Sequence, residues 1–268
     1  MHHKKYNEAK RLIEAGIPVL LTGDAGSGKS TLAREIARDM DLRFFSISLT
    51  RQTTLSHMLG FLSVNGTYIP SNLRDSFENG GLMLLDELDA GDANVLLCLN
   101  TIENGYISFP DKLVESHPDF RLVATSNPQD QHQFYTGRSK LDGATLDRFD
   151  IIDVDRDDNL EKSLVDHDTH QRMQLMRKLM KEYNMSKRVS MRDAIRYQKR
   201  KDLNLLSKEF IFRLADSSDA VIEKYSAQVA SLPKHQDQSE CETFDDLWNL
   251  INIRAGGKPT KDKEKSDD

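Results

Sequence analysis

The sequence contains no long apolar run. No stretch of about 18 consecutive apolar residues occurs in the 268-residue chain, which excludes a membrane-spanning helix. The first residues, Met-His-His-Lys-Lys-Tyr-Asn-Glu, also lack the apolar segment that secretory signals carry. We therefore expect neither a membrane contact nor a signal peptide.

Cysteine is scarce. The chain has two cysteines, Cys98 and Cys241, which lie far apart in sequence and form no metal-ligand spacing. Free thiols are expected in a reducing compartment, so the sequence predicts a cytoplasmic protein.

The chain also lacks an excess of positive charge. Its 37 Lys and Arg residues face 43 Asp and Glu residues, so the net charge is −6 and nucleic acid is an unlikely bulk partner. One local exception is the stretch 187–201, with seven cations and one anion. Its only aromatic residue is Tyr197, so the stretch predicts a solvated helix face rather than a single-strand binding site.

What the sequence does contain is a series of short apolar runs separated by helical patterns. This alternation predicts a parallel sheet covered by helices on both faces. The runs are 17–21, 43–48, 82–85, 120–124 and 150–154. Residues 160–230 show helical patterns without strand signals, which predicts a separate all-α part.

These patterns divide the chain into four predicted parts. Residues 1–15 form an N-terminal helix, 16–157 an α/β domain, and 158–235 a helical lid that follows an acidic, solvated linker at 153–158. The remainder, 236–268, contains a short amphipathic helix at 243–253 and a disordered tail. That helix would dock on the lid of its own chain or on a partner.

The clearest chemical motif is a glycine-rich loop after the first strand and before a helix. It fits G-x-x-x-x-G-K-[ST], whose backbone N–H groups surround phosphate oxygens at a helix N-terminus. Lys29 would add a charge for the β- and γ-phosphates, and Ser30 a hydroxyl ligand for Mg²⁺. The predicted nucleotide-binding residues are Gly23, Asp24, Ala25, Gly26, Ser27, Gly28, Lys29, Ser30 and Thr31.

A second motif ends the third apolar run. The segment Leu82-Met-Leu-Leu-Asp86-Glu87 is a buried strand followed by two carboxylates. Asp86 is the predicted second metal residue, acting on Mg²⁺ through water, and Glu87 is the predicted residue that polarises the attacking water.

With both motifs, the chain resembles the AAA+ ATPases. Thr125-Ser-Asn127-Pro128 resembles the family's sensor 1, which makes Asn127 the residue that orients the water. Gly143-Ala-Thr-Leu-Asp-Arg148-Phe149 resembles its arginine-finger motif, in which Arg148 reaches the nucleotide of a neighbouring subunit.

The resemblance implies an α/β fold of the P-loop NTPase class, AAA+ type. It has a five-stranded parallel sheet in the order 5-1-4-3-2, followed by a small all-α lid. It also implies hydrolysis of ATP to ADP and phosphate with Mg²⁺.

Further segments resemble the MoxR group within these ATPases. They are 86–90, 104–109, 117–127 and 135–138. The chain is most similar to the CobS subunit of cobaltochelatase, with CbbQ and NorQ as cousins, over residues 16–152. Ser190-Met-Arg192 resembles sensor 2, although Arg188 and Arg196 compete for that role and the subunit on which Arg192 acts stays open. Arg138 is either a second cation for a neighbouring subunit or a structural ion pair.

Two inserts are predicted hairpins. Residues 59–70 contain Asn65-Gly66 between alternating apolar residues, a strong hairpin signal. Residues 106–114 form the second. Both match inserts of the MoxR-like branch and would transmit hydrolysis to a substrate or partner, unless they pack passively on their own domain.

The resemblance therefore implies a ring-forming motor, most simply a hexamer of identical subunits. A separate protein, in relatives often one with a von Willebrand A domain, would supply specificity. The motor would remodel or activate a partner protein or a metal-chelatase complex. The alternatives are a nucleic-acid-associated motor and a nucleotide-gated scaffold with slow hydrolysis.

Overall fold

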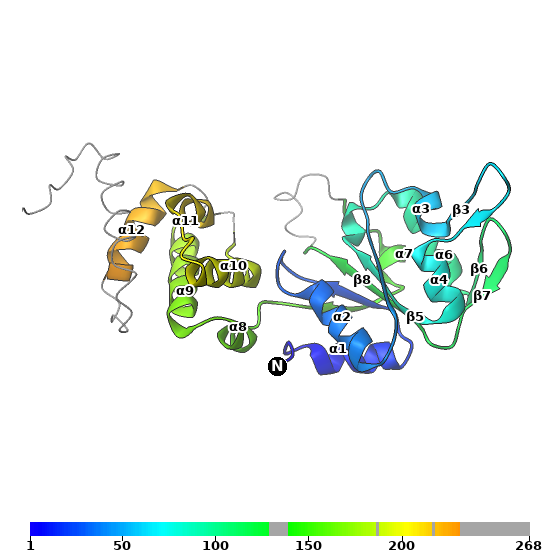
Figure 1. Ribbon diagram of the computed structural model, residues 1–268, viewed down its shortest axis with the longest axis horizontal. Coiled ribbons are helices and arrows are strands. Elements are labelled where there is room, and N and C mark those ends of the chain that lie inside the picture. Colours follow the sequence, from blue (N-terminus) through cyan, green and yellow to red (C-terminus); the bar gives the residue numbers. More distant parts are fainter. Residues whose placement is uncertain (129–138, 186–187, 216–217, 231–268) are drawn as a thin grey trace, which may run out of the picture. The chain divides into compact units, whose positions relative to one another are not determined.

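The computed structural model describes residues 1–128, 139–185, 188–215 and 218–230 (Figure 1). The chain divides into two compact units with a boundary after Leu160, and each unit is described by itself. No helix within the described residues is both long enough and apolar enough to span a lipid bilayer.

The first unit alternates strands with helices. Its elements are α1 (Tyr6–Glu14), β1 (Val19–Thr22), α2 (Lys29–Asp39), β2 (Phe44–Ser48), α3 (Leu55–Leu59), β3 (Phe61–Leu62), β4 (Tyr68–Ile69), α4 (Asn72–Asn79), β5 (Gly81–Asp86), a 3₁₀ turn (Leu88–Ala90), α5 (Ala93–Leu96), α6 (Leu99–Glu103), β6 (Tyr106–Ser108), β7 (Leu113–Glu115), β8 (Phe120–Ser126), α7 (Gly143–Leu146) and β9 (Asp150–Asp153). Helix α8 (Asp158–Leu164) spans the boundary between the units.

Five of these strands form one parallel sheet in the order β2-β5-β8-β1-β9. If only these five strands are numbered along the chain, their order is 2-3-4-1-5. This is the predicted order 5-1-4-3-2 listed from the opposite edge of the sheet. The predicted fold class is therefore confirmed. Strand β1 lies between β8 and β9, so its carboxyl end is flanked by the ends of two other strands.

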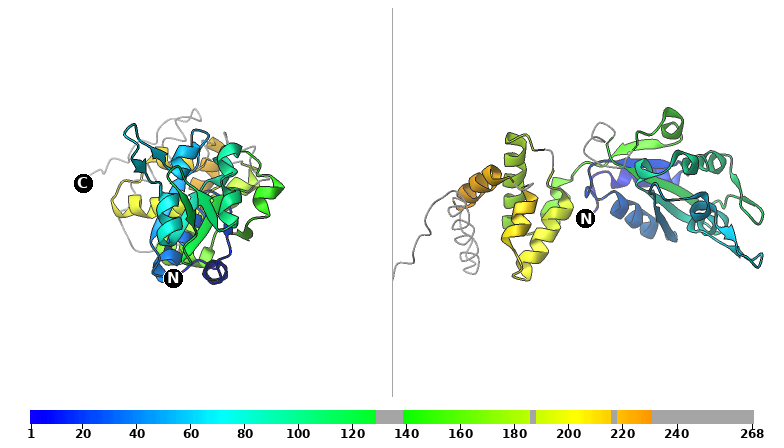
Figure 2. Two further views of the ribbon diagram at one scale, coloured as in Figure 1. Left: turned by 90° about the vertical axis from the view of Figure 1, so that its right-hand side faces the viewer. Right: turned by 90° about the horizontal axis from the view of Figure 1, so that it is seen from above.

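Helices cover both faces of this sheet, because alternate strand residues point to opposite sides. Val19 and Leu21 pack with α1 and α2, whereas Leu20 packs with α3, α4 and α6 on the other face. Figure 2 shows the same layers from two further directions. The strands that form the centre of the sheet are buried on both sides, as expected for parallel strands between helical layers.

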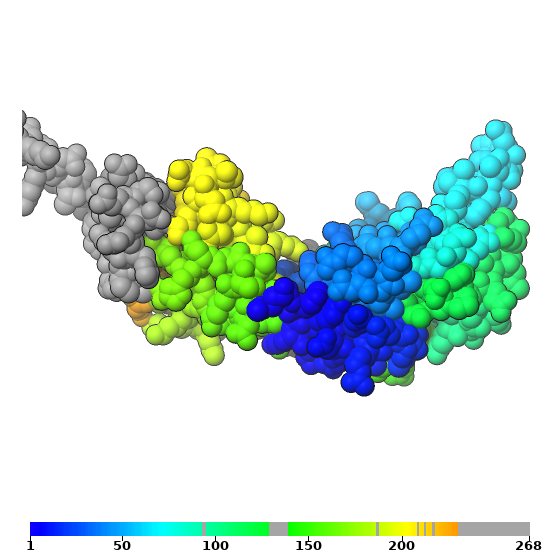
Figure 3. Space-filling model, turned by 60° about the horizontal axis from the view of Figure 1, so that its bottom comes forward, coloured from blue at the N-terminus to red at the C-terminus, as the bar shows by residue number. Residues whose placement is uncertain are grey.

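Two antiparallel hairpins extend from the second of these faces. In β3–β4, Phe61 pairs with Ile69, and the turn is closed by the bond from Gly66 N to Ser63 O. The turn is therefore longer than a two-residue Asn-Gly turn. In β6–β7, Tyr106 pairs with Glu115. Figure 3 shows the segment around residues 61–69, in cyan, as a projection from the first unit.

The acidic junction is only partly solvated: Asp153 and Asp155 are exposed, as predicted, but Asp157 is buried. Asp157 is only 5% exposed, and its carboxylate accepts bonds from the backbone N–H groups of Lys4, Asn159 and Leu160. The His3 ring lies 2.8 Å from the Asp155 carbonyl oxygen. The junction thus begins α8 and anchors the N-terminal segment of the chain.

The second unit is helical over its described residues. It contains α9 (His167–Glu182), α10 (Met191–Asp202), α11 (Lys208–Leu214) and α12 (Asp219–Ala230), which share one apolar core. Asp166, Ser190 and Ser207 cap the first three of these helices through side-chain bonds to backbone N–H groups. The predicted helix 243–253 and tail lie outside the described residues.

Candidate functional site

The functional motifs meet at the carboxyl edge of the sheet. Thr22 pairs with Ser126 in the β1–β8 ladder, and Leu85 pairs with Ala124 in the β5–β8 ladder. The glycine-rich loop, the Asp86-Glu87 pair and Asn127 therefore leave three neighbouring strands at the same edge. Parallel α/β sheets bind ligands at such an edge.

The loop has the backbone geometry that its glycines permit. Gly23, Gly26 and Gly28 have φ values of +151°, +80° and +102°. A Cβ atom on Gly23 would also lie 2.3 Å from the carbonyl oxygen of Val154, so space as well as conformation requires glycine there. Gly28 is the N-cap of α2, so the loop opens onto a helix N-terminus.

The Lys29 side chain lies across the loop. It is 9% exposed, and its Nζ donates hydrogen bonds to the carbonyl oxygens of Gly23 at 2.6 Å and Asp24 at 3.0 Å. These bonds place a buried ammonium group inside the turn. Ala25 and Thr31 are exposed, one in the loop and the other in the first turn of α2.

The Ser27 hydroxyl is a further feature of the loop that fits a bound phosphate group. This hydroxyl is buried, and among the described residues it has no hydrogen-bond partner. A buried polar group without a partner is costly, and a phosphate oxygen would satisfy it. Together with the helix N-terminus and Lys29, the loop supplies donors and positive charge to an anion.

Ser30 and Asp86 form the predicted metal pair, and the structure brings them together. The Ser30 hydroxyl donates to the two carboxylate oxygens of Asp86, at 3.0 and 3.1 Å. A hydroxyl and a carboxylate at this distance are the oxygen ligands that Mg²⁺ prefers, so these residues fit that ion.

Thr125 belongs to the same network, although the sequence motifs did not predict a role for its side chain. Its hydroxyl donates to Asp86 Oδ1 at 2.5 Å and accepts from the backbone N–H of Glu87 at 3.0 Å. One side chain thus orients both acidic residues. The sequence signal was a polar residue at the end of an otherwise apolar strand.

Glu87 stands directly after β5 with a φ of +61°. This left-handed conformation costs a residue with a Cβ atom roughly 1 kcal/mol or more, and such strain gathers at functional sites. Asn127, the other predicted water-orienting residue, is buried at the end of β8 and is 5% exposed. Both residues lie at the edge that carries the phosphate loop.

The structure places Arg148 at the other edge of the sheet. Arg148 precedes β9, whose first residue, Asp150, pairs with Val19 at the amino end of β1. Its guanidinium donates to the Ala144 carbonyl oxygen, and its Nε lies 3.5 Å from Glu103 Oε2. Arg148 is thus not brought together with the phosphate loop of its own chain.

The other two predicted arginines do not belong to the described part of the first unit. Arg192 is exposed in the first turn of α10, within the second unit. Arg138 lies outside the described residues.

The chain is similar in sequence to known proteins. Residues 18–149 match the family described as AAA domain, dynein-related subfamily. The chain is 31% identical over 152 residues to midasin of Giardia intestinalis, covering 53% of this chain and 3% of midasin. It is 27% identical over 207 residues to the gas vesicle ATPase GvpN of Haloferax mediterranei, covering 63% and 58% of the two chains. The chain thus spans three fifths or less of these curated relatives.

The solved structures extend the likeness of the fold. The ATP complex of NtrX from Brucella abortus superposes with a TM-score of 0.55 at 14% identity, covering 95% of this chain and 64% of that one. At this identity the likeness concerns the fold alone. Residues 18–149 therefore match the AAA domain of the dynein-related subfamily, and their sheet and glycine-rich loop have the geometry of a P-loop nucleotide-binding fold.

Proposed function

We propose that this chain is the subunit of a ring-shaped ATP-driven motor of the MoxR type, close to CobS, whose nucleotide sites lie between subunits. The placement of Arg148 carries the proposal. The cation that would stabilise charge on the transferring phosphoryl group lies at the opposite sheet edge from Lys29. A neighbouring copy would supply it, and AAA+ proteins commonly assemble as rings.

Within one subunit, each residue has a distinct part. The loop and Lys29 hold the phosphates, Ser30 and Asp86 hold Mg²⁺, and Thr125 fixes Asp86. The bound ion neutralises charge on the phosphate oxygens. Glu87 accepts a proton from water that Asn127 orients, and Arg192 senses the nucleotide from the lid. These roles are inferences from residue chemistry and from the resemblance.

The hairpins suit a protein partner. Several apolar side chains on them are half exposed or more, namely Phe61, Leu62, Val64, Tyr106 and Leu113. Clustered exposed apolar residues are typical of protein-binding surfaces. We therefore infer that ATP turnover remodels or activates a partner protein or a metal-chelatase complex, with a von Willebrand A protein as the candidate adaptor. The buried free thiol of Cys98 fits the inferred cytoplasmic setting.

The test combines assembly and turnover in one variant. Glu87→Gln removes the base but keeps the site's shape, so turnover should fall about 100-fold or more while ATP binding persists. Sedimentation with ATP should then show a stable ring. Glu8→Gln, an exposed carboxylate of α1, is the control and should behave like the unaltered protein. A Glu87→Gln protein that stays monomeric with bound ATP would overturn the ring.

The second candidate is a nucleic-acid-associated motor, which the cations of α10 favour. Turnover of the unaltered protein should be measured with and without single-stranded and duplex DNA. A many-fold stimulation would replace the protein-partner function with this one.

A further inference from the structure

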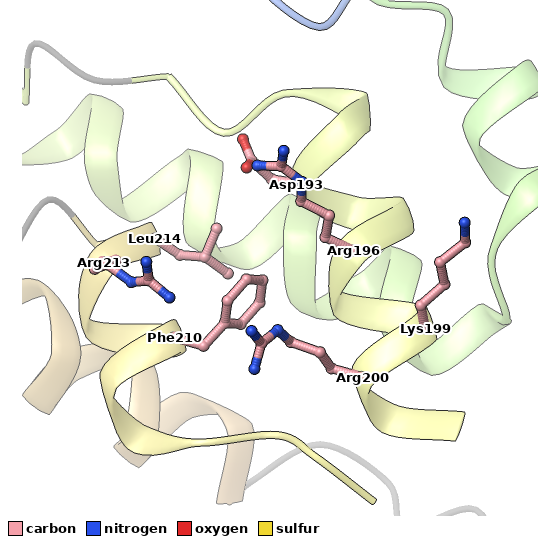
Figure 4. Close-up of a pocket in the computed structure, with 7 residues that line it drawn as sticks. All are labelled: Asp193, Arg196, Lys199, Arg200, Phe210, Arg213 and Leu214. Carbon is pink, nitrogen blue, oxygen red and sulfur yellow. The ribbon is translucent and has the colours of Figure 1, made fainter. Parts of the chain in front are cut away.

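The second unit contains a basic cavity lined by none of the residues to which the proposed function gives a role. It lies between α10 and α11 and has a volume of about 460 Å³. Arg200 and Arg213 flank the ring of Phe210, Arg196 extends toward Asp193, and Lys199 points away from the ring (Figure 4). A cavity of this size accommodates several side chains or a small ligand.

The charge of this cavity is strongly positive. Among the described residues that line it, four are cations and one is a carboxylate, that of Asp193, so their formal charges sum to +3. The Asp193 carboxylate is engaged in capping α10, where it accepts bonds from the Ser190 backbone N–H and hydroxyl at 3.0 and 2.7 Å. Guanidinium groups match carboxylates and phosphates, so the cavity would take an anionic ligand.

Its aromatic residue is poorly placed to stack on a base. Phe210 is 7% exposed, and the Arg200 guanidinium covers its ring at 4.7 Å from the centroid. Single-strand binding proteins present open aromatic faces to successive bases. The cavity therefore fits the carboxylates of a peptide better than a nucleic acid.

The chain itself contains such a peptide. Residues 237–246, Asp-Gln-Ser-Glu-Cys-Glu-Thr-Phe-Asp-Asp, have five carboxylates and no Lys or Arg. They lie outside the described residues and follow α12, which packs on α11. Helix α12 is about 18 Å long, and the six residues after it span at most about 20 Å, so Asp237 can return to α11 even from the far end of α12.

We propose that the acidic segment 237–246 binds the basic cavity between α10 and α11 of its own chain. The guanidinium groups of Arg196 and Arg213 pair with its carboxylates, and the neighbouring Phe244 contacts the apolar floor of the cavity. Nucleotide binding is not needed for this contact, so the inference does not rest on the proposed function. The segment covers a surface that would otherwise attract other polyanions.

Trp248, the only tryptophan of the chain, reports on this contact two residues beyond the segment. In the full-length protein without nucleotide, Arg196→Glu/Arg213→Glu should raise acrylamide quenching of Trp248 roughly twofold, because like charges repel the segment. The matched control is Lys178→Glu/Lys181→Glu, which makes the same charge change at exposed positions of α9 outside the cavity. It should leave quenching unchanged.

A charge swap distinguishes the loss of ion pairs between the segment and the cavity from damage to the fold of the second unit. Adding Asp245→Lys/Asp246→Lys to the cavity variant should restore the quenching of the unaltered protein, and a helical circular dichroism spectrum confirms folding. Equal quenching in the unaltered protein and the cavity variant would overturn the proposal, as would failure of the swap. If quenching varied with protein concentration, the segment in the cavity would belong to a second copy of the chain, and binding within one chain would be overturned. A labelled oligonucleotide could also bind the unaltered protein and not the cavity variant, while the quenching of Trp248 is the same in both. The ligand of the cavity would then be nucleic acid, and the proposal would be overturned.

Discussion

Arg74 holds Asp111 through both ends of its guanidinium group: Nη1 lies 2.7 Å from Oδ1, and Nη2 lies 3.3 Å from Oδ2. Its Nε donates to Glu78 at 2.9 Å, and the group stacks on the rings of Tyr68 and Phe109, 5.1 and 4.7 Å from their centroids. Tyr68 belongs to the first hairpin, and Phe109 and Asp111 belong to the turn of the second. One buried cation of α4 thus joins both inserts.

Replacing this cation should loosen both hairpins together. Arg74→Met keeps an apolar stem but removes the charged bonds, which should lower stability by roughly 2–3 kcal/mol. Hydrogen exchange should rise in both 61–69 and 106–115. A double-mutant cycle with Asp111→Asn should give a coupling of about 1 kcal/mol or more.

The control for this prediction is an exposed arginine. Arg38→Met breaks an ion pair with Asp39 at a side chain that is 69% exposed, so its effect should be within about 0.5 kcal/mol. Increased exchange in only one hairpin of the Arg74→Met protein would contradict the joint role of Arg74.

Thr125 offers a test of how the two acidic residues are held. Thr125→Val keeps the shape of the side chain but removes the Thr125 acceptor of the Glu87 backbone N–H. It also leaves Asp86 with the Ser30 hydroxyl and without the Thr125 hydroxyl as a donor. Such a loss is worth about 1–3 kcal/mol, so turnover should fall roughly tenfold and the Mg²⁺ concentration for half-maximal turnover should rise. The measurement is ATP turnover over a Mg²⁺ titration.

Thr125→Ser retains the hydroxyl and is the matched control. It should restore most of the turnover and the Mg²⁺ dependence. If the valine variant had normal turnover at low Mg²⁺, Thr125 would be a strand residue without a positioning role.

The sequence predicted those parts of the fold that depend on local pattern. Runs of apolar residues separated by helices are sufficient to indicate a buried parallel sheet, and the loop glycines indicate their own backbone conformations. The strand order came from the resemblance, and the structure confirms it.

What the sequence did not predict depends on contacts between distant segments. Thr125 is an ordinary β-branched strand residue until register places it beside Asp86. Arg74 is one of many charged helix residues until both hairpins close around it. Asp157 belongs to an acidic run that looks solvated, yet it is buried because backbone N–H groups of Lys4 and α8 satisfy it. Composition does not encode such partners.

The position of Arg148 predicts complementation between defective subunits. Lys29→Ala removes the loop cation, and Arg148→Ala removes the finger, so each variant alone should lose turnover by about 10³-fold or more. In an equal mixture, about one quarter of the interfaces would combine an intact loop with an intact finger in a ring of head-to-tail contacts. Turnover of the mixture should therefore reach about a quarter of the normal value.

The double variant Lys29→Ala/Arg148→Ala is the control, because mixing it with either single variant creates no intact interface. Subunit exchange is verified by native mass spectrometry. An inactive mixture despite verified exchange would show that Arg148 does not act across subunits.

Asp166 makes the helical unit sensitive to acid. Burial acts to raise its pKa, but the backbone N–H of Thr169 at 2.6 Å, with Lys201 and Gln198, outweighs burial and lowers the pKa from 3.8 to about 2. Because the pKa is depressed in the folded state, the stabilisation is fully present above pH 3.8. It disappears as the pH falls toward about 2.

Asp166→Asn isolates this charge, because asparagine also caps helices. At neutral pH the unaltered protein should be more stable by about 1 kcal/mol, less than full linkage predicts because the carboxylate is partly exposed. Urea unfolding of both full-length proteins, followed by circular dichroism from about pH 7 to pH 2, should show this difference shrink below about pH 4 and vanish toward pH 2. Asp41→Asn in the first unit is the control. A difference that stayed constant over the whole range would mean that the capping geometry, and not the charge of Asp166, stabilises α9.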